Sequence, residues 1–281
     1  MELRCGYRNS NLPGASSAKI RTTRMDTWRT AIVDAGPTHI RIRGHDILDL
    51  MRQSTFTDVV FLLHHERLPS VAERRLIDAI LIGSSDHGAG APSCAAARLA
   101  ASGNRQSPAA AIAAGVLTIG DEHGGAGSAC MELIAEGLAR ARRDALSFDA
   151  AAAHLVDEAK SAGRRLPGFG HRVHSTNDSR VDVLFTLAQD SGLAGDGIRF
   201  ARALESAIRE RIKPIPLNID GALAAILIDL GLPPMVGKLL FIVGRVAGLS
   251  AEVLEEYTRE KPMRINIPVE YDGVTPRRDG Q

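Results

Sequence analysis

The sequence has little of several features that would each indicate a class of protein. It has three cysteines, Cys5, Cys94 and Cys130, without a CxxC spacing, which argues against a disulfide framework and a thiolate zinc site. Its 34 basic and 33 acidic residues leave a net charge of +1, so no global field attracts nucleic acid or an anionic membrane. Any anionic ligand must therefore be bound by a local cluster of positive charge.

Long apolar runs are also missing. The longest covers 222–249 and is interrupted by Asp229, Pro233, Pro234 and Lys238, which divides it into two helix-sized pieces rather than one membrane span. The N-terminus has no apolar core followed by a small-residue cleavage site. Together with the unpaired cysteines, these absences predict a cytoplasmic protein that does not enter membranes.

What the chain does have is helical patterning. Its 281 residues, 44% of them hydrophobic, are enough for one large domain or a large and a small one. Apolar residues recur at one-turn spacing, for example from Leu76 to Leu81, and alanine-rich runs lie between glycine and proline breaks. We expect an all-α fold of about a dozen helices, with a loosely ordered arm at 1–38 and one short strand at 38–44.

Polar residues stand at four glycine-rich breaks between apolar helices. These breaks are SDHG at 85–88, EHGGA at 122–126, GFGHR at 168–172 and NIDG at 218–221. Each histidine or acid there could be a turn or capping residue satisfied by nearby backbone. Asp220 in particular reads either as an N-cap or as a general base that its apolar neighbours Ile215, Leu217 and Ile219 remove from water.

Arg245 lies between valines in a strongly apolar helix, so its charge requires an anionic partner, either an internal acid or a substrate carboxylate. Metal chemistry is the competing hypothesis. His64 and His65 before Glu66, and His171 with His174, match no HExxH or cysteine–histidine pattern, so we expect no metal site. The glycines at 124–127 lack the Lys-Ser/Thr of a nucleotide-hydrolysing loop, although their amides could receive an anion.

Six motifs in order make the chain resemble the citrate synthase superfamily. They are DHG (86–88), EHGGA (122–126), PGFGHRVHSTNDSR (167–180), NIDG (218–221), FIVGR (241–245) and EKPMR (260–264). Within the superfamily, VLTIGDEHGGAG, GFGHRV and LNIDGALAAILIDLGL are most similar to citryl-CoA lyases and to the citryl-CoA-cleaving module of ATP-citrate lyase. The likeness extends from about residue 40 to residue 264.

The resemblance implies an all-α homodimer or higher homo-oligomer whose subunits have two domains. The large domain would comprise 39–124 and 232–281, and a small domain at 125–231 would close over the substrate. The catalytic triad would be His123, His171 and Asp220. Binding of substrate carboxylates is implied for His87, Arg180 and Arg245, and the CoA adenine would lie along a loop made of Pro167, Gly168, Phe169 and Gly170.

The implied reaction is the retro-aldol cleavage of citryl-CoA to acetyl-CoA and oxaloacetate, with CoA entering only as part of the substrate and no permanently bound cofactor. Two alternatives stay open. One is citrate or 2-methylcitrate synthase, which needs the same triad, and the other is a non-catalytic relative that binds CoA or a partner. The chain departs from the family at Lys261, where an arginine commonly reaches the neighbouring subunit's substrate, and Arg264 is the candidate replacement.

Overall fold

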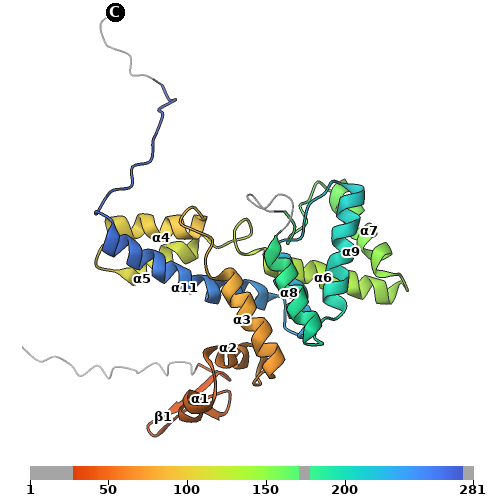
Figure 1. Cartoon of the computed structure of the whole chain (residues 1–281), viewed down its shortest axis with the longest axis horizontal. Coiled ribbons are helices and arrows are strands. Elements are labelled where there is room, and N and C mark those ends of the chain that lie inside the picture. The colour runs from red at the N-terminus through yellow and green to blue at the C-terminus, as the bar shows by residue number, and fades with distance from the viewer. Residues whose placement is uncertain (1–27, 171–177, 275–281) are drawn as a thin grey trace, which may run out of the picture.

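The computed structural model describes residues 28–170 and 178–274, and it is mostly helical, as predicted. Three short strands precede eleven helices in this part of the chain (Figure 1). The strands are β1 (Val33–Gly36), β2 (His39–Ile42) and β3 (His45–Asp46). The helices are α1 (Ile47–Gln53), α2 (Phe56–His65), α3 (Val71–Ser85), α4 (Pro92–Gly103), α5 (Pro108–Leu117), α6 (Ala126–Arg143), α7 (Phe148–Ser161), α8 (Ser179–Asp190), α9 (Asp196–Arg211), α10 (Ile219–Asp229) and α11 (Met235–Arg259).

The strands form one antiparallel sheet in the order β1-β2-β3. The strand predicted at 38–44 is β2, which pairs with β1 in a register that sets Val33 opposite Ile42. Within the segment 1–38, which we expected to be a loosely ordered arm, 33–36 form a strand, while 1–27 lie outside the described residues. Pairing with β2 decides this difference, since the four residues VDAG contain only one β-branched residue and are too few to indicate a strand on their own.

Local sequence explains where several helices begin. Thr55 and Asp58 form a capping box at the start of α2, and Ser70 and Glu73 form another at the start of α3. Helices α4 and α5 each begin with proline, whose missing N–H would have no partner in a first turn. The helix boundaries are therefore largely encoded in short capping patterns.

Buried apolar residues form two clusters. The larger one joins α2, α3 and α6–α10 around side chains such as Phe200 and Ile134, which are fully buried. The smaller one joins α4, α5 and the second half of α11, and is built largely of alanines. Helix α11 contacts α3, α4, α5 and α6, so this one long helix connects both clusters (Figure 1).

The end of α3 lies directly against α11. A Cβ on Gly244 would lie 2.8 Å from the carbonyl oxygen of Leu81, and one on Gly248 would overlap the carbonyl oxygen of Ser85. Only glycine at these two positions allows the two backbones to approach so closely. The contact brings the 85–88 break beside the helix that carries Arg245. None of the described helices combines the length and apolar character needed to cross a bilayer.

Candidate active site

Asp220 lies in the first turn of α10, but it does not cap that helix. Asn218 is the N-cap, because its side-chain oxygen accepts the backbone N–H of Gly221 at 3.1 Å. Oδ1 of Asp220 is fully enclosed and has no hydrogen-bond partner among the described residues. Burial raises the pKa of Asp220 to about 6, although the charges of Arg180 and Arg245 act in the opposite direction. Asp220 is therefore a desolvated carboxyl and not the cap of α10.

Arg180 is held beside α10 by a buried acid, Asp178. The guanidinium donates from Nε to Oδ1 of Asp178 at 2.8 Å and from Nη2 to Oδ2 at 2.7 Å, and Nη1 reaches the carbonyl oxygen of Gly83 at 3.2 Å. Asp178 also accepts the backbone N–H of Ile219 at 3.2 Å, directly before Asp220. This bidentate pair fixes a cation next to the unpartnered carboxyl of Asp220.

His123, Ser93 and Arg245 form a hydrogen-bonded group that joins three distant segments. Both the backbone N–H of Ser93, at 3.3 Å, and its hydroxyl, at 2.9 Å, lie against Nε2 of His123. Nη1 of Arg245 donates to the same hydroxyl at 2.9 Å, which leaves the hydroxyl proton for the histidine. Because Nε2 is surrounded by donors, a neutral His123 carries its ring proton on Nδ1.

Arg245 itself is 2% exposed and is satisfied mainly by neutral groups. Its Nε donates to the carbonyl oxygen of Ser84 at 3.0 Å, and its guanidinium stacks over the ring of Phe241 at 4.9 Å. Among the residues that the structure describes, no carboxylate forms an ion pair with it. Its charge acts to lower the pKa of Asp220, against the larger effect of burial.

The loop at 167–170 packs tightly against the start of α10. Its backbone is tied to the 216–218 segment through the N–H of Gly170, which donates to Pro216 at 2.8 Å, and the carbonyl of Gly168, which accepts from Asn218 at 3.0 Å. Gly168 has a φ of +84°, and a Cβ there would lie 2.5 Å from Sγ of Cys130. The glycine is therefore required by both conformation and space.

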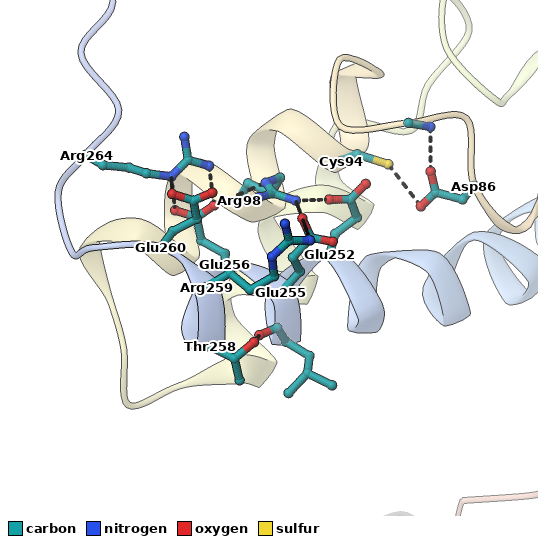
Figure 2. A network of polar contacts seen from close by, with 12 residues as sticks. Asp86, Cys94, Arg98, Glu252, Glu255, Glu256, Thr258, Arg259, Glu260 and Arg264 are labelled. Atoms are coloured by element: carbon teal, nitrogen blue, oxygen red, sulfur yellow. Dashed lines mark hydrogen bonds and ion pairs between the residues drawn. The ribbon is translucent and has the colours of Figure 1, made fainter.

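The remaining predicted site residues fall in different places. His87 is exposed in the break after α3, Lys261 is exposed after α11, and His171 lies outside the described residues. Arg264 donates from Nε and Nη2 to the fully buried carboxylate of Glu256, at 3.0 and 2.6 Å (Figure 2). The structure thus brings His123, Asp220, Arg180 and Arg245 together, and it commits Arg264 to an internal pair.

The adjacent histidines His64 and His65, which the sequence offered as metal ligands, both contact backbone carbonyl oxygens. His64 contacts the carbonyl oxygen of Val60 at 2.8 Å, and His65 contacts that of Leu230 at 3.0 Å. A different group, made of Asp86, Cys94 and Glu252, brings its ligand atoms within 4.8 Å of one another in the described part of the chain. Glu252 is already bound by Arg98, and Asp86 accepts the thiol of Cys94, so these ligand atoms are engaged in polar contacts with protein groups.

Sequence reasoning missed Ser93 and Asp178. Ser93 follows the proline that opens α4, a position that carries no chemical signal by itself. Asp178 had a usable signal, because an acid directly before an apolar helix is typical of an N-cap, and it does cap α8 through the N–H of Arg180.

An enclosed carboxyl at the start of α10, one arginine at the start of α8, a second arginine within α11 and a histidine shortly before α6 thus lie together in an all-helical fold. Residues 71–266 match the citrate synthase C-terminal domain family. This match covers well over half of the chain, and the chain belongs to the citrate synthase family.

Three known proteins illustrate what the chain is similar to. The structure of citryl-CoA lyase from Hydrogenobacter thermophilus has a TM-score of 0.81 and 36% identity, covering 89% of this chain and 96% of that one. Citrate synthase from Haloferax volcanii is 27% identical over 73% of this chain and 52% of its own length. ATP citrate lyase from Methanothrix soehngenii, solved with citrate and coenzyme A, has a TM-score of 0.68 and 20% identity over 97% of this chain and 47% of that one, which shows the fold alone.

This chain spans about half the length of the citrate synthase that it matches. The class that these relatives define is an enzyme of lyase or citrate synthase type.

Proposed function

We propose that the protein is a citryl-CoA lyase that cleaves citryl-CoA to acetyl-CoA and oxaloacetate. The observation that carries this proposal is the enclosed Asp220, whose Oδ1 has no hydrogen-bond partner among the described residues and whose pKa burial raises to about 6, beside the cations Arg180 and Arg245. A carboxyl group of this kind can hold a proton near neutral pH and still release it to carbon. The likeness to a citryl-CoA lyase over nearly the whole of both chains supports cleavage over condensation.

In the proposed reaction, His171 removes the proton from the tertiary hydroxyl of the citryl group. The oxygen electrons form the keto group of oxaloacetate, the adjacent carbon–carbon bond breaks, and its electrons pass into an enolate of acetyl-CoA. The Nδ1–H of His123 donates to the thioester oxygen as it becomes anionic. Asp220 then gives its proton to the enolate carbon. The proton that His171 removed from the hydroxyl passes to Asp220, which restores the starting state of both groups.

The substrate would be held by charges already in place. His87, Arg180 and Arg245 would bind its carboxylates, and the CoA adenine would lie along 167–170, with closure of 125–231 excluding water. We further propose a homodimer or higher homo-oligomer in the cytoplasm. Lys261, which is exposed, would then be the cation that reaches a neighbouring subunit, because Arg264 is bound by Glu256.

Citrate or 2-methylcitrate synthase is the second candidate, favoured by the likeness to a citrate synthase. Purified protein incubated with citryl-CoA, and separately with acetyl-CoA plus oxaloacetate or other 2-oxo acids, distinguishes the two. Rapid cleavage of citryl-CoA without stoichiometric release of free CoA is expected. Sustained CoA release from acetyl-CoA and a 2-oxo acid would instead identify a synthase.

A non-catalytic CoA-binding relative is the third candidate, motivated by Lys261 in place of arginine. It is tested in the same assay with Asp220→Ala as the control variant. Turnover by the wild-type chain that this substitution abolishes would eliminate a purely binding role. Binding of CoA by both proteins with turnover by neither would support it.

A further inference from the structure

Beside the candidate site, the chain between α3 and α4 forms a short loop that carries two residues of interest. His87 lies near its start, and Ser93, which contacts both His123 and Arg245, lies at its end in the first turn of α4. The position of His87 relative to Ser93 therefore depends on how this loop is closed.

Asp86 closes the loop at both ends. Its Oδ1 accepts the backbone N–H of Gly88 at 2.5 Å, and its Oδ2 accepts the thiol of Cys94 at 3.6 Å, one residue after Ser93 (Figure 2). Gly88 has a φ of +85°, and its carbonyl accepts the N–H of Ala91 at 2.9 Å, which completes the turn toward α4. One carboxylate thus links the C-cap residue of α3 to the loop and to the next helix.

The surroundings keep this carboxylate in place. Gly248 of α11 lies so close that a Cβ there would come within 2.5 Å of Oδ2 of Asp86. Cys94 is fully buried, and burial, with the nearby charge of Asp86, raises the pKa of its thiol, so the thiol keeps the proton it donates. The nearby Glu252 is bound by Nη1 of Arg98 at 2.5 Å, which offsets the repulsion between the two carboxylates.

We propose that Asp86 is a positioning residue, which clasps the 86–94 loop through Gly88 and Cys94 and so fixes His87 relative to the Ser93, His123 and Arg245 group. The proposal rests on the proposed function for its kinetic consequence, because His87 is assigned there to a substrate carboxylate. Asp86 itself need not touch the substrate.

The test compares graded variants of the clasp in the citryl-CoA cleavage assay. Asp86→Ala removes both acceptors and should lower kcat/KM about 10-fold or more, mainly through a higher KM, while the affinity for CoA alone stays within about twofold. Asp86→Asn should lie between this variant and the wild type. Cys94→Ser, which keeps a donor, should be close to the wild type, whereas Cys94→Ala should lose about three- to tenfold.

Asp46→Ala is the matched control, because Asp46 accepts the N–H of Leu48 two residues later at 2.9 Å and lies in the N-terminal sheet, which carries none of the candidate site residues. It should leave KM unchanged. If Asp86→Ala fails to fold, the two Cys94 variants decide. Equal kinetics for Cys94→Ser and Cys94→Ala, or an Asp86→Ala protein with wild-type KM, would overturn the proposal.

Hydrogen exchange separates this proposal from the proposed function. The amides of Gly88 and Ala91 should exchange faster in Asp86→Ala and not in Asp46→Ala. If the wild-type protein does not cleave citryl-CoA but this difference is seen, the clasp stands and the proposed function fails. Unchanged exchange at both amides would overturn the clasp whatever the activity.

Discussion

Two carboxyl groups in the first turns of their helices have opposite properties. Glu73 of α3 receives two hydrogen bonds from Arg67, at 2.6 and 3.0 Å, and completes a capping box with Ser70, and these partners lower its pKa from 4.5 to about 2. Asp220 of α10 has an enclosed oxygen without a partner among the described residues, and burial raises its pKa from 3.8 to about 6. Both carboxyls lie in the first turn of a helix, so their partners and surroundings, and not the turn itself, account for the opposite pKa shifts.

The largest expected effect is on turnover at Asp220. Asp220→Asn keeps the shape of the side chain but cannot deliver a proton, so kcat for citryl-CoA cleavage should fall by about 100- to 10,000-fold. Glu73→Gln should leave kcat within about twofold, because Glu73 lies in the capping box of α3 and contacts none of the candidate site residues. Normal turnover by Asp220→Asn would contradict the assignment of its role.

Glu73→Gln, which should have little effect on turnover, should have a clear effect on the stability of the fold. Glu73→Gln leaves the guanidinium of Arg67 without its carboxylate and weakens the cap, so the free energy of unfolding should fall by about 1–3 kcal/mol at pH 7. Because the pKa of Glu73 is lower when folded, its contribution is complete above pH 4.5 and is lost as the pH falls toward 2. Urea denaturation of both proteins at pH 7 and pH 3 measures this. An equal loss at both pH values would contradict the linkage.

Short-range sequence patterns point to the candidate chemical residues of the site more readily than to the residues that support them. His123 and Asp220 stand in glycine-rich breaks, which short-range patterns can indicate. The roles of Ser93 and Asp178 arise from contacts with residues far along the chain, such as Arg245 and Ile219, and no local pattern encodes these contacts. For the same reason, the pairing of Arg264 with Glu256 was missed.

Removing the ionisable group at Asp220 should make the protein more stable at neutral pH. The folded pKa of about 6 exceeds the ordinary value of 3.8, so ionisation is penalised only in the folded state and stability falls as the pH rises through 6. Asp220→Asn should therefore raise the free energy of unfolding by about 1–3 kcal/mol at pH 8. The gain should vanish below about pH 4. Urea denaturation at these two pH values measures it, and destabilisation at pH 8 would show that the carboxylate has a structural partner.

The smallest expected effect is the pH dependence of the wild-type enzyme. Cleavage requires Asp220 in its protonated form, so kcat/KM for citryl-CoA, which reports the free enzyme, should decline as the pH rises above about 6. Cleavage takes up no net proton, so the equilibrium constant does not change with pH over this range. Because that constant is the ratio of kcat/KM in the two directions, kcat/KM for condensation must show the same decline. Glu73→Gln should keep this profile, because it changes the stability of the fold and not the titrating group. A profile that stays flat from pH 6 to pH 8 would mean that Asp220 is not the proton donor, and the contrast between the two carboxyls would then concern stability alone.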